Sequence, residues 1–252
     1  MKTKLTLLII FGVVLLFSAG AHAVVINETI FAELQPKSSH LSIGDRIAFW
    51  AGKFIGTPYD PDPLGEYVRK SVIVADERVD CMYHTFRSVE LAQSTTYDES
   101  IARALDLRFR TEGVLDEQGK VTNYDDRFQY GEDMVLSGKW GKNVTSSLGK
   151  TMTIPGARDI ESIRILPKKG AVRSVKKLRS GDIIFFVKDP AKRKVDEIVG
   201  HIGIVSRTKG GVYLIHASGN KNNNGEVKKA DLTGYLKTMP FVGMLVTRFD
   251  VF

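Results

Sequence analysis

The chain contains one cysteine, Cys81, and five histidines. Hydrolysis by a thiol requires the thiolate, which is a minor species at neutral pH because the free cysteine side chain has a pKa of about 8.5. Cys81 follows Asp80 where a helical pattern begins, so we expect it in the first turn of a helix. There the free backbone N–H groups and the helix dipole favour an anion and form a candidate oxyanion hole. Cys81 is therefore a candidate nucleophile, with a buried structural cysteine as the alternative.

The general base must come from a distant part of the chain, and two histidines occur on neighbouring strand-like segments. His201 opens one segment, and His216 closes the next at hairpin distance. This spacing allows His216 to hydrogen-bond the far nitrogen of His201 and fix its tautomer, while Gly203 would leave room beside the imidazole. The alternative is that each histidine is simply packed or exposed. His84, on the helix of Cys81, is a rival base but is poorly placed to approach the thiol from the substrate side.

Composition and charge exclude several other classes of protein. Of the 252 residues, 43% are apolar and 26% are charged, which is typical of neither disordered nor collagen-like chains. One cysteine cannot form an internal disulfide, and no Cys/His group has zinc-ligand spacing, so we expect no metal and no organic cofactor. Positive charge is concentrated in residues 168–179, which we interpret as a solvated face, with attraction to an anionic envelope polymer as the alternative. Nucleic acid is not an expected partner.

Residues 1–23 have the layout of a secretory signal peptide. Lys2 and Lys4 precede an apolar run over residues 5–17, and the small-residue tripeptide AHA follows at 21–23. The apolar run is shorter than the roughly 20 residues that span a bilayer. We therefore expect cleavage after Ala23, with a retained anchor as the alternative. The mature protein would be exported to the periplasm or the extracellular space, without an integral membrane span.

Helical patterns come first in the mature chain and strand patterns follow. Residues 24–41 are interpreted as an irregular or short-strand lead-in. Capping signals at Ser42 and Thr96 predict helices over 43–54 and 96–107, and further helices are predicted from Cys81 and over 126–137, the last ending at Gly138. Residues 182–188, 201–207 and 211–217 are short and rich in branched and aromatic residues, so they are predicted as antiparallel strands. This order indicates an α+β fold.

Five strings, taken in order, resemble the NlpC-type cell-wall cysteine peptidases, a papain-like superfamily: GTPYDPD (56–62), VDC (79–81), LRSGDIIFF (178–186), GHIGIV (200–205) and YLIHASG (213–219). The resemblance covers residues 43–240. It implies that Cys81 is the nucleophile, that His201 is the base and that His216 completes the triad. It also implies that the Tyr59 hydroxyl is aimed at the neighbourhood of Cys81, with ordinary packing as the alternative. Asp80 is expected to orient the backbone around the thiol or only to cap the helix.

Within the superfamily, the chain is more similar to the N-acetylmuramoyl-L-alanine amidase-like branch. That branch has an extended segment after GTPY and a long insertion between the cysteine helix and the histidine strands, here about 95–175. The run CMYHTFRSVE departs from the branch, which usually continues DC with a short threonine, aromatic, valine and glutamate run. The resemblance implies one catalytic domain over 24–252 with a papain-like α+β fold, in which N-terminal helices pack on a central antiparallel sheet and the insertion is helical.

The expected activity is hydrolysis of an amide bond in peptidoglycan fragments by an exported cysteine hydrolase. The amidase-like branch implies cleavage between the muramic acid lactyl carbonyl and L-alanine, with peptidoglycan or a muropeptide as the substrate. Three alternatives remain: a D-glutamyl-diamino acid endopeptidase, a non-catalytic wall-binding protein, and a thiol acyltransferase.

Overall fold

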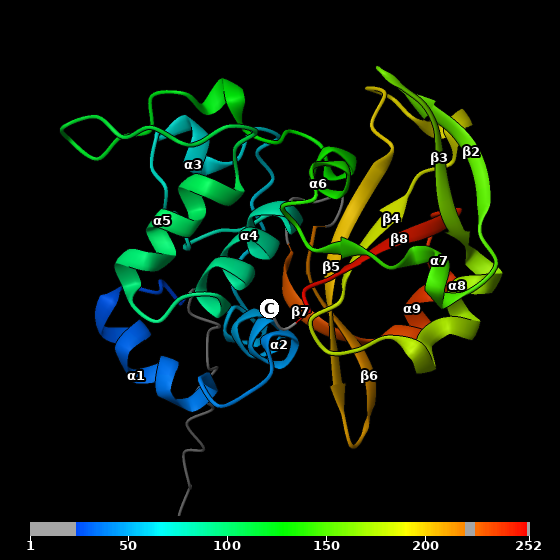
Figure 1. Ribbon diagram of the computed structural model, residues 1–252, viewed down its shortest axis with the longest axis horizontal. Helices are drawn as coiled ribbons and strands as arrows, with labels where there is room; N and C mark the ends of the chain where they lie inside the picture. Colours follow the sequence, from blue (N-terminus) through cyan, green and yellow to red (C-terminus); the bar gives the residue numbers. More distant parts are fainter. Residues whose placement is uncertain (1–23, 220–224, 251–252) are drawn as a thin grey trace, which may run out of the picture.

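A computed structural model describes residues 24–219 and 225–250. The predicted signal peptide, residues 1–23, lies outside the described residues. The ribbon divides into a helical half and a half built on one sheet (Figure 1). This confirms the α+β class and the central antiparallel sheet. Across the two described ranges, none of the helices has the length and apolar character needed to cross a membrane.

The helices are α1 (Glu28–Ser38), α2 (Ile43–Lys53), α3 (Glu66–Arg69), α4 (Cys81–Ala92), α5 (Tyr97–Leu107), α6 (Gly131–Ser137), α7 (Thr145–Leu148), α8 (Lys168–Ser174) and α9 (Leu232–Thr238), with 3-10 turns η1 (Tyr124–Asp126), η2 (Val175–Lys177) and η3 (Pro190–Lys192). The strands are β1 (Lys142–Asn143), β2 (Met152–Ala157), β3 (Ile160–Pro167), β4 (Ile183–Val187), β5 (Val199–Thr208), β6 (Gly211–Ser218), β7 (Glu226–Asp231) and β8 (Gly243–Arg248).

Three helices begin where the sequence predicts them, because each has a local cap. The side chains of Ser42, Asp80 and Thr96 each accept a hydrogen bond from the backbone N–H three residues later, at the starts of α2, α4 and α5. Such a cap satisfies one of the N–H groups that a helix start leaves free. The start of α4 at Cys81 is therefore fixed by its own sequence.

Residues 28–38 form helix α1, so the prediction of an irregular or short-strand lead-in was wrong. The Asn27 side chain caps this helix by accepting from the Ile30 N–H at 2.9 Å. The sequence signal is weak because Phe31 is the one fully buried apolar residue in the helix, and Pro36 lies inside it. Phe31 stacks on Trp50 of α2 with ring centroids 5.3 Å apart, so a tertiary contact stabilises α1.

The helix predicted over 126–137 begins later, at Gly131, although it ends at Gly138 as predicted. Before it, the chain is extended. The Phe128 N–H donates to the carbonyl of Arg108 at 2.9 Å, and Arg127 pairs with Phe109 in an isolated antiparallel bridge. These backbone groups bond to a distant segment and so cannot form helical hydrogen bonds. As a result, residues 127–130 run along the edge of a cavity described below.

The sheet is antiparallel, in the order β2-β3-β8-β4-β5-β6-β7, with β1 pairing to β8. Strands β4, β5 and β6 confirm the three predicted strands. The insertion at about 95–175 is not simply helical, which corrects the prediction, because it contains β1 and the β2–β3 hairpin. Strand β8, from the end of the chain, lies between β3 and β4.

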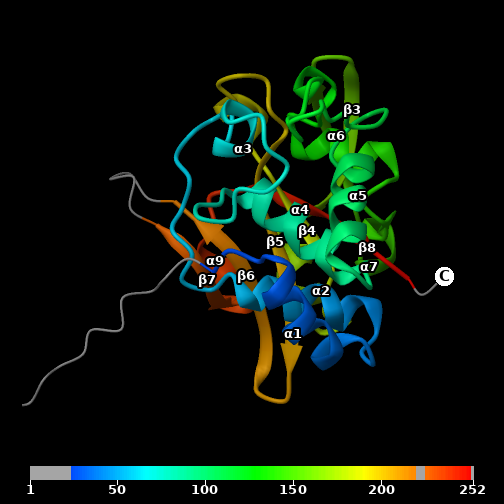
Figure 2. The same cartoon turned by 90° about the vertical axis from the view of Figure 1, so that its left-hand side faces the viewer.

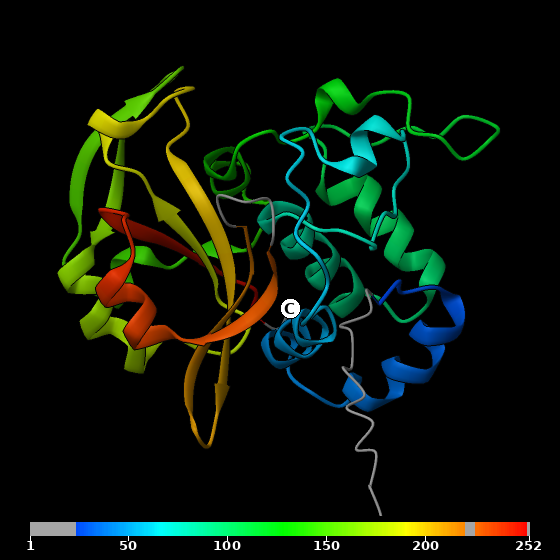
Figure 3. The same ribbon diagram turned by 180° about the vertical axis from the view of Figure 1, so that it is seen from behind.

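Both faces of the sheet are covered. Along β4, Ile183 and Phe185 face the core formed with α2, α4 and α5, whereas Ile184 and Phe186 face the core formed with α8 and α9. A strand that is buried on both faces reads as a continuous apolar run, which is the pattern of residues 182–188. Seen from behind, β5 runs along the boundary between the sheet and the helical half (Figure 3).

Helix α4 is the central helix of the helical half. Every side chain from Tyr83 to Ala92 is buried, and the helix packs against α2, α5 and strand β5 (Figure 2). A helix that is buried all round cannot shift without disturbing each of these partners. Its first residue, Cys81, is therefore held firmly beside the sheet.

Candidate active site

A cavity of about 190 Å³ lies where the start of α4 meets the start of β5. Cys81 and Asp80 line it from α4, and His201 lines it from β5. The chain around residues 63–67 and the extended segment 127–131 form the remaining walls. The structure thus brings the predicted nucleophile and the predicted base, which lie far apart in the sequence, to one cavity.

Cys81 is half-buried, and its sulfur is surrounded by backbone donors. Burial and, to a smaller extent, the neighbouring Asp80 carboxylate together raise the pKa of the thiol to about 12. The backbone N–H groups of Ile202, Cys81 and Met82 act in the opposite direction and lower the pKa, because they stabilise the thiolate. The resting side chain is a neutral thiol in a site that can stabilise developing negative charge.

His201 and His216 are hydrogen-bonded to each other across the β5–β6 hairpin. His201 Nε2 lies 2.7 Å from His216 Nδ1. The predicted contact between the two imidazoles is therefore present. Gly203 makes room for this pairing, because a Cβ at this position would lie 2.6 Å from Leu214 Cδ1 and 3.2 Å from His216 Cβ. The space that glycine leaves is thus beside His216 rather than beside His201.

Both imidazoles are neutral at physiological pH. Burial lowers the pKa of His201 to about 3 and that of His216 to about 4. When His201 Nε2–H donates to His216 Nδ1, the Nδ1 atom of His201 is left as a free acceptor for a proton. In this tautomer His216 carries its proton on Nε2, which is buried and has no hydrogen-bond partner among the described residues.

Aromatic side chains enclose the histidine pair and cause this desolvation. Phe186 and Phe241 stack on His201 with centroid distances of 5.8 and 6.4 Å. Tyr235 packs edge-on against His216 at 5.1 Å. Sequence reasoning missed Tyr235 and Phe241, because they come from α9 and the loop after it and no local motif marks them.

The rival base, His84, does not line the cavity. It is fully buried, and its Nε2 lies 3.2 Å from the carbonyl oxygen of Ala51 in α2. Burial lowers the pKa of His84 to about 4. Its contacts are those of a core residue that joins α4 to α2.

Asp80 and Tyr59 flank the nucleophile in different ways. Asp80 Oδ1 accepts from the Tyr83 N–H at 2.6 Å, so Asp80 caps α4, and burial raises the pKa of its carboxyl group to about 6. Tyr59 is half-buried and its backbone bridges to Val79. Burial is the main cause that raises the pKa of the Tyr59 hydroxyl, and the charge of Cys81 acts in the same direction. Its catalytic role stays a prediction.

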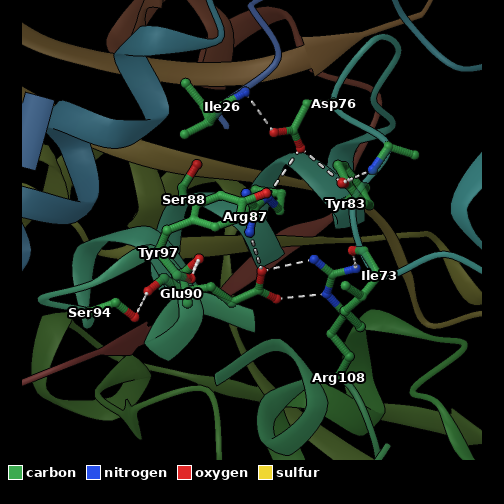
Figure 4. Close-up of polar contacts among 12 residues, drawn as sticks. Ile26, Ile73, Asp76, Tyr83, Arg87, Ser88, Glu90, Ser94, Tyr97 and Arg108 are labelled. Atoms are coloured by element: carbon green, nitrogen blue, oxygen red, sulfur yellow. Dashed lines mark hydrogen bonds and ion pairs between the residues drawn. The ribbon is translucent and has the colours of Figure 1, made fainter. Parts of the chain in front are cut away.

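A buried network of charged side chains anchors α4 to the end of α5 and to the loop before α4 (Figure 4). Arg108 Nε and Nη2 donate to the two carboxylate oxygens of Glu90 at 2.7 and 2.8 Å. Asp76 accepts from the Tyr83 hydroxyl at 2.8 Å and from Arg87 Nε at 3.1 Å. These charges are fully buried, and each is paired with an opposite charge, so they lock α4 to α5 and to the loop before α4. The sequence offers no local signal for contacts at such separations.

The sequence matches no protein-family model, and no curated protein matches it at a significant level. Solved structures do resemble the fold. A crystal structure of an N-acetylmuramoyl-L-alanine amidase from Bacteroides uniformis has a TM-score of 0.64 at 18% identity, covering 83% of this chain and 99% of that chain.

Two further structures are similar to a comparable degree. A protein of Legionella pneumophila str. Philadelphia 1 from the family DUF1460 has a TM-score of 0.67 at 14% identity and covers 87% of this chain and 93% of its own. A protein of Bacteroides fragilis described as a putative xylanase has a TM-score of 0.60 at 20% identity, covering 80% of this chain and 100% of its own. At these identities the likeness establishes a fold shared with a cell-wall amidase.

Proposed function

We propose that this protein is an exported cysteine hydrolase that cleaves an amide bond in peptidoglycan fragments. The hydrogen bond of 2.7 Å between His216 and His201, which lines the same cavity as Cys81, is the observation that carries the proposal. The arrangement has the three parts of a nucleophilic triad: a thiol at a helix start, an imidazole base and a polar group that fixes the base tautomer. The fold of the similar amidase structures supports the same chemistry. The proposed reaction requires neither a metal nor an organic cofactor.

In the first step, the Cys81 sulfur attacks the carbonyl carbon while His201 Nδ1 takes the thiol proton. The pair is neutral at rest because burial opposes both charges, so proton transfer accompanies the attack. Backbone N–H groups at the start of α4 stabilise the negative charge that develops. His201 then gives the proton to the leaving amine, and a thioester forms on Cys81. Water, activated by His201, hydrolyses that thioester and restores the thiol.

The bond between the muramic acid lactyl group and L-alanine is the proposed target. The amidase structures from B. uniformis favour it over the D-glutamyl-diamino acid bond. Export rests on the sequence pattern of residues 1–23.

Hydrolysis of a glycosidic bond is not favoured by the site, although one similar structure is described as a putative xylanase. That reaction needs two carboxyl groups, one as acid and one as base or nucleophile. Asp80 and Glu197 line the cavity. Asp80 is used as a helix cap, and Glu197 pairs with Lys188 and accepts from the Val195 N–H at 2.9 Å.

Digestion of defined muropeptides, followed by mass measurement of the products, tests the proposal. We expect free sugar and an intact stem peptide, and we expect Cys81→Ala to abolish their release. Release of a dipeptide would move the assignment to the endopeptidase. Unchanged cleavage by Cys81→Ala would exclude the triad.

A further inference from the structure

A buried guanidinium beside the proposed nucleophile lacks a charge partner. Arg127 is 8% exposed and lines the cavity that contains Cys81. Its Nη1 donates to the carbonyl of Tyr124 at 2.9 Å, and no carboxylate of residues 24–219 or 225–250 forms an ion pair with it. The other buried arginines, Arg87 and Arg108, each pair with a carboxylate.

A buried charge without a counter-ion is costly, so its persistence calls for a partner that arrives from outside. The two carboxylates on the cavity wall do not fill this role. Asp80 caps α4, and Glu197 pairs with Lys188. The backbone of Arg127 is fixed by its bridge to Phe109, and the bond from Nη1 to the Tyr124 carbonyl holds the guanidinium at the cavity wall.

A second donor lines the same cavity as Arg127. Tyr67, from α3, is 4% exposed and lines the same cavity. Burial is the main cause that raises the pKa of its hydroxyl, and the Asp80 charge acts in the same direction, whereas the charges of Arg108 and Arg127 lower it. No hydrogen bond of this hydroxyl to another described residue is present. The ring is fixed by its contacts with Tyr83 and Tyr124, at centroid distances of 5.1 and 5.6 Å.

We propose that Arg127, assisted by the Tyr67 hydroxyl, binds a carboxylate of the substrate peptide in the cavity beside Cys81. A planar guanidinium and a hydroxyl match the oxygens of a carboxylate, and the partly desolvated site strengthens their hydrogen bonds. The inference rests on the proposed function and adds to it a substrate preference. Stem peptides with free carboxylates bind, and peptides whose carboxylates are carboxamides bind poorly, because they leave the buried cation unpaired.

Binding to the full chain that carries Cys81→Ala tests this preference without turnover. The ligands are N-acetylmuramoyl-L-alanyl-D-glutamate and its analogue with both glutamate carboxylates replaced by carboxamides, and the measurement is calorimetry. We expect the analogue to bind about 10- to 100-fold more weakly. Adding Arg127→Gln should bring the two affinities within about twofold, and Arg127→Lys should keep part of the preference.

Two further variants separate recognition from folding. Tyr67→Phe keeps the ring contacts, removes only the hydroxyl and should reduce the preference about 3- to 10-fold. Arg110→Gln is the matched control, because Arg110 is exposed and does not line the cavity, and it should leave the preference intact. If Arg127→Gln unfolds at a lower temperature than the parent protein, the ligand preferences of Arg127→Lys and Tyr67→Phe decide whether the two side chains bind the carboxylate.

Equal binding of the two ligands to the Cys81→Ala protein would overturn the inference and leave the proposed hydrolase intact. A preference for the free carboxylates that persists in Arg127→Gln would also overturn the inference and leave the proposed hydrolase intact. Binding of neither ligand would instead contradict the proposed substrate class, and the inference would fall with it.

Discussion

Helix α4 borders two polar regions that differ in whether buried charges are paired. On the side that faces α5, Arg87 and Arg108 are paired with Asp76 and Glu90. On the cavity side, Arg127 has no carboxylate partner among the described residues, and His216 Nε2 has no hydrogen-bond partner among them. Buried polar groups in folded proteins are normally satisfied. Arg87 Nη2 on the paired side also lacks a partner among the described residues, so the two sides differ in charge pairing, and this difference supports the proposal that the cavity side meets a substrate.

The charge pairs on the side of α4 that faces α5 also help to position the cavity side. A helix fixed by several charge pairs holds its first turn in place, and that turn presents Cys81 and its N–H groups to the cavity. The comparison predicts that changes on the paired side alter folding, whereas changes on the cavity side alter reactivity.

The largest effect is expected on the cavity side, from removal of the base. His201→Ala should lower kcat/KM for the muropeptide about a thousandfold or more, because no other histidine of the described residues lines the cavity with Cys81. Steady-state kinetics measures this loss. His40→Gln is the matched control, since His40 is exposed and should keep full activity. Loss of less than about tenfold in His201→Ala would show that His201 is not the base.

On the paired side, Glu90→Ala leaves two buried guanidinium groups without a shared carboxylate. It should reduce the free energy of unfolding by about 3–5 kcal/mol, measured by urea denaturation. Glu33→Ala removes an exposed pair with Lys37 and should change the free energy of unfolding far less, because solvent screens the pair. Similar losses in the two variants would remove the distinction between the buried network and ordinary surface pairs.

At the junction of the two sides, Asp80→Asn keeps a helix cap and removes a negative charge beside the sulfur. The Asp80 carboxylate, after burial, raises the pKa of Cys81, so its removal lowers that pKa and increases the thiolate fraction. Alkylation of Cys81 by iodoacetamide at pH 8 should become about 3- to 10-fold faster. Asp231→Asn, at the cap of α9, should leave the rate unchanged. Slower alkylation of Asp80→Asn would contradict the predicted lowering of the Cys81 pKa.

The smallest effect is expected from a charged residue on the strand next to the histidine pair. Lys228 lies opposite His216 in the β6–β7 register. Burial is the main cause that lowers the pKa of both histidines, and the Lys228 charge lowers it further. Lys228→Gln should therefore raise both pKa values and move the acid limb of kcat/KM upward by a few tenths of a pH unit. Lys229→Gln should leave the limb in place, and a downward shift in Lys228→Gln would contradict the account.

Local signals predicted much of this site. The caps at Ser42, Asp80 and Thr96 act within one helical turn, so the sequence alone determines where α2, α4 and α5 begin. The hairpin spacing likewise predicted the contact between His201 and His216, because register in a short hairpin follows from the sequence.

The rest depends on contacts between distant segments. The pairing of residues 127–128 with 108–109 interrupts a helical pattern, and it is this interruption that places Arg127 on the cavity wall. The Arg108–Glu90 pair and the position of β8 between β3 and β4 have no signature within a short window of sequence. Helix α1 was missed because its one fully buried apolar side chain, Phe31, gives no periodic pattern.

Acid quenching of the enzyme during turnover of a muropeptide, followed by peptide mass spectrometry, tests the central claim most directly. The account predicts a thioester between the muramic acid lactyl carbonyl and the Cys81 sulfur, absent from Cys81→Ala. Turnover in Cys81→Ala at the rate of the unmodified chain, with no adduct on Cys81 of the unmodified chain, would contradict it.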